Sequence, residues 1–193
     1  MKNTFKQTLV AVALTGAFGI AQAQTTAIDS PGDLSYDLGA NPTSANAYVV
    51  THDTGSFSDV YTFTLSQESD TVSSAVALQQ PSLSGGGFDY NIEGGTFGLY
   101  SDADGDGMGG TLISSTTFGS NNTSLTADSV AAGSYYWMVA GNANGNLGGI
   151  YNFTTNTAPV PEPETYALML AGLGLLGFVG KRRMRQSSVN KFA

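Results

Sequence analysis

Short segments in which apolar and polar residues alternate follow one another from residue 48 to residue 155, and they restrict the fold more than any other feature. Alternation with a period of two places successive side chains on opposite faces of a β-strand. Glycine clusters at 85–87, 94–95 and 148–149 separate several of these segments, as turns between strands do. The pattern predicts eight strands, at residues 48–51, 57–66, 71–79, 88–92, 95–100, 111–114, 134–140 and 149–155.

The segment from residue 24 to residue 158, called the body below, has the length of one domain. It is rich in Gly, Ser, Thr, Asn, Tyr and Val, a composition typical of β structure, and short strands at this spacing favour a single antiparallel β-sandwich or jelly roll. The chain has no cysteine, so the rigidity of an all-β body must come from packing or metal ions. We expect residues 155–159 to form a linker after this domain.

The N-terminal segment has the features of a secretory signal peptide. Lys2 and Lys6 precede an apolar stretch at residues 8–20, and Ala21 and Ala23 place small residues where a signal peptidase reads them. We therefore expect residues 1–23 to be removed and the mature chain to begin at Gln24. A retained N-terminal membrane helix is the alternative.

The C-terminal segment has three parts: a proline-containing motif, an apolar run at residues 166–180 and a basic cluster. The motif is Pro161, Glu162 and Pro163, and the cluster comprises Lys181, Arg182, Arg183 and Arg185. An apolar helix followed by basic residues indicates a transmembrane segment whose charges remain in the cytoplasm. At about 22 Å its length falls short of the roughly 30 Å hydrocarbon core, which suits a temporary anchor in the inner membrane. A permanent tail anchor remains the alternative.

All seven lysine and arginine residues lie near the two ends, and none occurs between residues 7 and 180. This placement predicts that the ends stay cytoplasmic while the body is exported. Thirteen of the 15 acidic residues belong to the body once Glu162 and Glu164 are set aside, so its formal charge is −13. Such a charge excludes nucleic acid as a partner. It also means that an extracellular polysaccharide would have to be neutral or held through a bridging cation.

The C-terminal sequence resembles the PEP-CTERM sorting signal of Gram-negative bacteria. The resemblance lies in V-P-E-P-x-x-Y-A-L-M-L-A-G-L-G-L-L-G-F, which is followed by arginines. The resemblance implies a sorting signal at 159–185 with a cytoplasmic tail at 186–193. It also implies recognition and removal of the tail by an exosortase near Pro161, Glu162 and Pro163, and an exopolysaccharide-producing host. The expected destination is the cell surface or an extracellular biofilm matrix.

Asp59 lies in phase with the apolar residues of its predicted strand. Phe57, Tyr61 and Phe63 share its face, so a carboxylate is expected among core aromatics. Either it accepts bonds from backbone N–H groups of a neighbouring loop and locks the sandwich, or it ligates a metal near the sheet edge. Phe57, Asp59 and Tyr61 resemble the motif of the FxDxF subfamily of PEP-CTERM proteins, with Tyr61 in place of the last Phe. That resemblance also implies a sandwich, but no known activity for the body.

The segment from Asp102 to Gly107 places Asp102, Asp104 and Asp106 at alternate positions before a glycine, a spacing that suits a Ca²⁺-binding loop. The match to an EF-hand is partial because Ile113 occupies the position of the bidentate Glu. A solvated hairpin loop is the alternative, since Asp and Gly favour turns. Further ligands would come from elsewhere, with Asp89 and Asp128 as candidates.

The strand at 134–140 carries aromatic side chains on both faces. If Trp137 belongs to the core, Tyr136 is expected to face solvent, where its ring could stack on a sugar. Catalytic signatures are absent from the sequence: the only histidine is His52, expected at a strand end, and there is no Gly-x-Ser-x-Gly elbow or Cys/His cluster.

These observations favour a non-enzymatic, exported surface or matrix protein. A calcium-dependent glycan-binding or adhesion module is the second hypothesis, and a secreted hydrolase is the third. The only cofactor for which the sequence offers candidate ligands is Ca²⁺.

Overall fold

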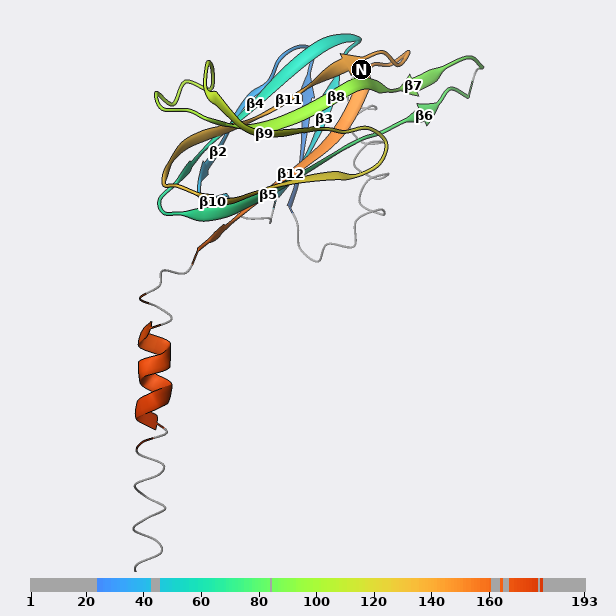
Figure 1. Ribbon diagram of the computed structural model, residues 1–193. Coiled ribbons are helices and arrows are strands. Elements are labelled where there is room, and N and C mark those ends of the chain that lie inside the picture. The colour runs from blue at the N-terminus through green and yellow to red at the C-terminus, as the bar shows by residue number, and fades with distance from the viewer. Residues whose placement is uncertain are drawn as a thin grey trace, which may run out of the picture. The chain divides into compact units, whose positions relative to one another are not determined.

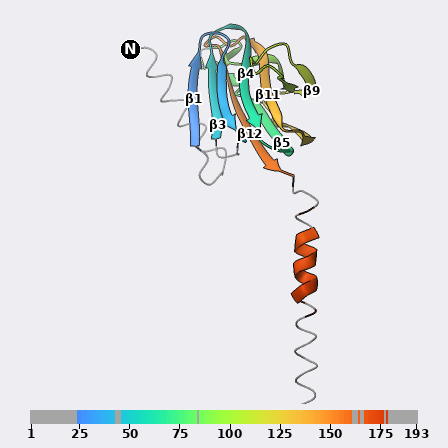
Figure 2. The same ribbon diagram turned by 90° about the vertical axis from the view of Figure 1, so that its left-hand side faces the viewer.

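The computed structural model describes residues 24–42, 46–83, 85–160, 164, 167–176 and 178. The chain divides after Pro159 into two units, which are considered separately. The first unit contains every strand of the described residues (Figures 1 and 2). The expected cleavage residues Ala21 and Ala23, the sorting motif and the basic cluster all lie outside the described residues.

Two five-stranded sheets and a short two-stranded hairpin make up the first unit. The strands are β1 (Gln24–Ser30), β2 (Ser35–Ala40), β3 (Asn46–His52), β4 (Gly55–Leu65), β5 (Ser69–Ala77), β6 (Gln80–Pro81), β7 (Phe88–Tyr90), β8 (Ile92–Ser101), β9 (Thr111–Thr117), β10 (Thr123–Val130), β11 (Gly133–Ala143) and β12 (Gly149–Pro159). Sheet A has the order β1-β3-β12-β5-β10, and sheet B has the order β2-β4-β11-β8-β9. The expected β-sandwich is therefore confirmed.

The expectation of purely antiparallel sheets is wrong at one edge of each sheet. Strand β1 pairs with β3 in parallel, and β2 pairs with β4 in parallel. The cause is the order in which the chain visits the sheets, because β1 to β4 alternate between A and B. Strands that are two apart in sequence then run in the same direction and become neighbours, and the strand between them serves as the crossover that parallel pairing requires.

The core lies between the sheets and is built largely from aromatic rings. The Tyr61 ring on β4 stacks on the Phe153 ring of β12 with centroids 4.6 Å apart. Trp137 on β11 is fully buried and meets the same Phe153 ring edge-on at 6.3 Å. Aromatic pairs of this kind add about 0.5–1.5 kcal/mol each beyond the area that they bury. Contacts of β4 and β11 with β12 thus hold the two sheets together.

The end of β12 differs from the sequence interpretation, which placed a linker at residues 155–159. Strand β12 instead continues to Pro159, where it pairs with Ser69 of β5. Thr155 and Thr157 keep the alternation and are buried, and Thr157 donates both its backbone N–H and its hydroxyl to the carbonyl oxygen of Pro42. β-branched residues favour strands, which explains why β12 continues through these polar threonines.

The second unit contains helical residues 164, 167–176 and 178. Its large side chains, including Leu168 and Leu176, are exposed. Within the part of the chain that the structure describes, no helix combines the length and the apolar character needed to cross a membrane.

Candidate functional site

Asp59 lies at the centre of a buried polar network that joins the two sheets. Its side chain is fully buried, as its phase on β4 predicted. The Oδ1 atom accepts a hydrogen bond from the backbone N–H of Leu34 at 2.9 Å. The Oδ2 atom is 2.8 Å from Nε2 of His52 and also accepts a hydrogen bond from the Tyr151 hydroxyl.

These contacts agree with the locking role of Asp59 and extend it. One donor is the expected backbone N–H of a loop, and the other two are side chains of sheet A. Both carboxylate oxygens are engaged by protein groups, so the geometry favours the lock over a metal ligand. The sequence indicated that Asp59 is buried but did not reveal its partners, His52 and Tyr151.

Tyr61 extends the network, because its hydroxyl lies 2.7 Å from that of Tyr151. Burial raises the pKa of Tyr61 well above its ordinary value of 10.0. Burial also raises the pKa of Tyr151, and the neighbouring Tyr61 and Asp59 raise it further. Both hydroxyls therefore remain protonated in the folded protein at neutral pH.

His52 ends β3, as expected, but its surroundings are those of a core residue. Its imidazole stacks on the Phe57 ring with centroids 4.1 Å apart. The side chains of His52 and Asp59 are 2% and 0% exposed. A histidine and a carboxylate in contact could in principle form an acid–base pair, but this pair has no surface on which a substrate could reach it.

The loop between β8 and β9, yellow-green in Figure 1, brings together the three carboxylates that the sequence singled out. Asp102, Asp104 and Asp106 each offer one oxygen, and these atoms lie within 4.8 Å of one another. Asp89 and Asp128, the other candidate ligands, lie on β7 and β10 and do not belong to this cluster. Ile113 lies on β9, so the loop ends before the position at which an EF-hand would supply its Glu.

Within the cluster, Asp102 is buried and the other two are exposed. The Oδ2 atom of Asp102 accepts a hydrogen bond from the N–H of Gly107 at 2.9 Å. Its Oδ1 atom is also buried and has no hydrogen-bond partner among the described residues. The Oδ1 atom of Asp106 accepts from the N–H of Met108, so the loop carries both satisfied and free carboxylate oxygens.

The expectation that Tyr136 faces solvent is wrong, because the Asp-containing loop covers it. Trp137 occupies the core as expected, so Tyr136 lies on the outer face of sheet B, yet it is only 4% exposed. Its ring stacks on Tyr100 at 4.9 Å, and its hydroxyl accepts a hydrogen bond from the N–H of Gly110. Burial raises the pKa of Tyr136, and the charges of Asp102 and Asp106 contribute to the rise.

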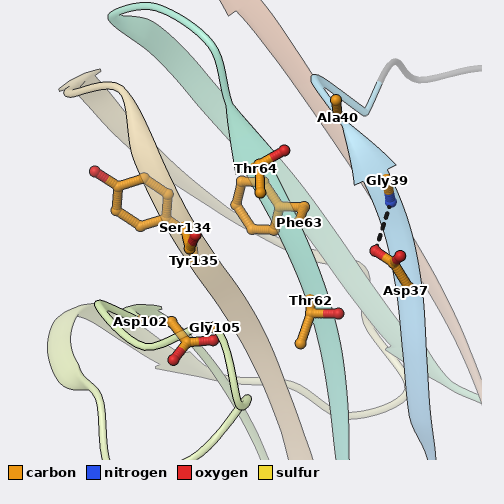
Figure 3. Close-up of a pocket in the computed structure, with 10 residues that line it drawn as sticks. All are labelled: Asp37, Gly39, Ala40, Thr62, Phe63, Thr64, Asp102, Gly105, Ser134 and Tyr135. Atoms are coloured by element: carbon orange, nitrogen blue, oxygen red, sulfur yellow. Dashed lines mark hydrogen bonds between the residues drawn. The ribbon is translucent and has the colours of Figure 1, made fainter.

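A hollow of about 520 Å³ lies beside this loop (Figure 3). Asp102 and Gly105 border it on the loop side, and Asp37 borders it on β2. Thr62 and Thr64 of β4 form part of its wall. The hollow thus combines hydroxyls with carboxylates next to the acidic cluster.

A second hollow, of about 660 Å³, has several amide side chains in its lining. Gln79 donates to Asn91, Asn91 donates to Asn144, and Asn144 donates to the carboxylate of Glu93. Phe88 and Phe118 contribute rings to the lining. The residues that line this hollow come from four separate segments, so their proximity was not evident in the sequence.

Pro161, Glu162, Pro163 and the basic cluster lie outside the described residues, but their sequence can be compared with known families. Residues 159–183 match the PEP-CTERM protein-sorting motif. This motif implies an exosortase as a partner and an exported protein that is anchored at a membrane before it reaches the surface. No curated protein matches the chain.

Several solved structures are similar to part of the chain. The pre-peptidase C-terminal domain of a collagenase from Bacillus anthracis is 17% identical, with a TM-score of 0.38 over 64% of this chain and 96% of its own. PliG from Aeromonas hydrophila, a periplasmic inhibitor of g-type lysozyme, is 16% identical, with a TM-score of 0.32 over 65% of this chain and 99% of its own. A family 35 carbohydrate-binding module from an environmental isolate is 12% identical, with a TM-score of 0.28 over 57% of this chain and 74% of its own.

Proposed function

We propose that this protein is a non-enzymatic component of the cell surface or extracellular matrix, exported with a cleaved signal peptide and processed by an exosortase. The observation that carries the proposal is the sorting motif at residues 159–183. The exosortase reads Pro161, Glu162 and Pro163 in this scheme. The apolar run anchors the chain in the inner membrane until processing, with the basic cluster on the cytoplasmic side.

The C-terminal limit of the fold supports this scheme. Strand β12 ends at Pro159, where the sorting motif begins. Removal of the segment after Pro159 would therefore leave every strand of the described body in place.

We further assign the body to the FxDxF type of PEP-CTERM proteins. The support is the resemblance of Phe57, Asp59 and Tyr61 to its motif, and all three residues are buried on one face of β4. Asp59 binds both sheet A and the loop before β2, so the motif serves to hold the sandwich together.

The absence of catalysis is part of the proposal. Among the described residues, the single histidine is buried against Asp59, and no cysteine occurs in the chain. Screening the full chain against glycan and ester substrates should detect no turnover. Reproducible turnover that survives repurification would refute the non-enzymatic assignment.

Sorting is tested by following the full chain in an exosortase-containing host. Replacing Glu162 with Gln and Pro161 with Ala should leave a longer, membrane-retained product, because the enzyme no longer recognises its motif. Pro31→Ala, a change in an exposed bend about 130 residues before the motif in the sequence, is the matched control and should be processed normally. Normal processing of the motif variant would rule out exosortase recognition at this site.

Glycan binding is the second candidate function, and the hollow beside the acidic cluster is the observation that favours it. Hydroxyl and carboxylate groups around a concave surface can hydrogen-bond neutral sugars, and a cation could bridge to acidic ones. The test is co-sedimentation of the full chain with the host's extracellular polysaccharide, with calcium and with excess chelator. Binding that requires calcium supports this candidate, whereas no binding in either condition eliminates it.

A further inference from the structure

We propose that Asp102, Asp104 and Asp106 bind one calcium ion, and that this ion fastens the loop between β8 and β9 over the outer face of sheet B. The inference does not depend on exosortase sorting. It concerns a divalent-cation site built within one loop of the folded body.

The three carboxylates of the loop lie close together. Their ligand oxygens lie within 4.8 Å of one another. Like charges at such distances repel by about 1 kcal/mol or more per pair, depending on the local dielectric. The part of the chain that the structure describes contains no lysine or arginine to offset this repulsion. A bound cation would remove the repulsion and turn the cluster into a stabilising feature.

The buried oxygen of Asp102 supports the site independently of the cluster's charge. Asp102 is 1% exposed, and its Oδ1 atom has no hydrogen-bond partner among the described residues. A buried polar atom without a partner is costly, and native proteins rarely leave a carboxylate oxygen in that state. The same carboxylate is the buried member of the convergent group, so an ion bound there would supply the missing interaction.

The type of donor indicates which ion is bound. Every side-chain donor in the cluster is a carboxylate oxygen, and the described residues add no histidine to it. Hard oxygen donors suit Ca²⁺ rather than zinc or copper. Asp104 makes no hydrogen bond within the described part of the chain, and Asp102 and Asp106 each use only one oxygen on loop N–H groups. Backbone carbonyl oxygens of the loop and water would complete the six to eight ligands that Ca²⁺ takes.

The loop rests closely on sheet B, which gives the ion a structural consequence. A Cβ atom on Gly107 would lie 3.1 Å from Cγ1 of Val60 and 3.2 Å from Cγ2 of Thr62. A Cβ atom on Gly110 would lie 2.9 Å from Cε1 of Tyr136. The loop backbone therefore covers β4 and β11 directly, and an ion that stabilises this loop keeps Tyr136 buried.

Calcium titration of the full chain tests the site directly. We expect one ion per chain with a dissociation constant on the order of 0.1–1 mM, the range of extracellular modules with few charged ligands. Terbium bound in its place should give luminescence excited through Tyr136 and Tyr100, because Tyr136 contacts the loop. Calcium should displace the terbium and abolish the signal.

Asp104→Asn is the decisive variant, because Asp104 is exposed and its replacement leaves the hydrogen bonds of the loop intact. It should weaken calcium binding by about tenfold or more, since one of three charged ligands is lost. Asp53→Asn is the matched control, as an exposed aspartate outside the cluster. Unchanged affinity in Asp104→Asn, an equal loss in both variants, or no saturable binding would overturn the proposal.

Hydrogen exchange supplies a second readout that separates a structural ion from a loosely held one. With calcium, the N–H groups of Gly107 and Gly110 should exchange at least about tenfold more slowly, because the ion disfavours loop opening. The strands of sheet A should show no change and provide an internal control. Identical exchange with calcium and with chelator would contradict a fastening role for the ion.

Discussion

Asp59 shows how one side chain can connect three separate parts of a sandwich. It extends from β4 to a backbone N–H before β2 and to side chains on β3 and β12. The sequence placed Asp59 on the core face of its strand, because the alternation of side chains between the two faces depends only on neighbouring residues. Its partners His52 and Tyr151 were not readable, because pairing between the sheets depends on how distant segments pack, and Tyr151 is 92 residues away.

Replacing Asp59 with Ala should lower the free energy of unfolding by at least about 3 kcal/mol. The change leaves the N–H of Leu34, His52 and the Tyr151 hydroxyl without their acceptor, and each buried unpaired group costs about 1–3 kcal/mol. Urea unfolding of the full chain measures the loss. Asp53→Ala, an exposed control, should change stability by less than about 0.5 kcal/mol. Equal stability of the two variants would show that the Asp59 network is unimportant.

Tyr61 and Tyr151 should make the protein unstable in alkali. Because burial raises their pKa in the folded state, the folded chain retains protons that the unfolded chain loses above pH 10.0. Their contribution is complete below pH 10.0 and is lost as the pH rises towards the folded-state pKa, at up to about 1.4 kcal/mol per pH unit for each tyrosine. Urea midpoints measured between pH 8 and 11 should show this fall. Tyr61→Phe should make the slope shallower, and a flat profile for the unchanged protein would contradict the assignment.

At the level of elements, the central strands were predictable and most edge strands were not. Strands β4, β11 and β12 are paired on both sides and supply large buried side chains to the core, so apolar and aromatic residues mark them in the sequence. Strands β1, β2 and β10 lie at sheet edges, where fewer side chains must be apolar, and all three were missed. The parallel pairing of β1 and β2 was also beyond local reasoning, because it results from the order in which the chain visits the two sheets.

Gly148 controls the junction between β3 and β12. Its φ is +100°, and a Cβ atom there would lie 1.9 Å from the carbonyl oxygen of His52. Gly148→Ala should therefore cost about 2 kcal/mol or more in unfolding free energy, through backbone strain and displacement of β3. Gly119→Ala is the control, since nothing lies within 4 Å of its Cβ position and its φ lies outside the positive range that L side chains rarely adopt. A thermal melt in which the two variants match would disprove this role for Gly148.

For the whole molecule, charge distribution predicts an unusual response to salt. The body has a formal charge of −13 and no lysine or arginine, so folding brings like charges together. Raising NaCl from 20 mM to 500 mM should increase the unfolding free energy by on the order of 1 kcal/mol, because salt screens the repulsion. Urea unfolding with chelator present at both concentrations removes any contribution from calcium. A decrease in stability with salt would contradict this account.

The direct passage from β12 into the sorting motif has a mechanical consequence. Only Val160 separates Pro159, the last strand residue, from Pro161, and two residues span at most about 7 Å. If an exosortase joins the chain to a surface partner near this point, almost no linker separates the sandwich from the attachment site. A pull along β12 acts at right angles to its hydrogen bonds with β3 and β5, so the bonds share the load in shear instead of opening one by one. Strand β12, which leads into the sorting motif, would then also bear the tension between the cell and any partner that the body binds.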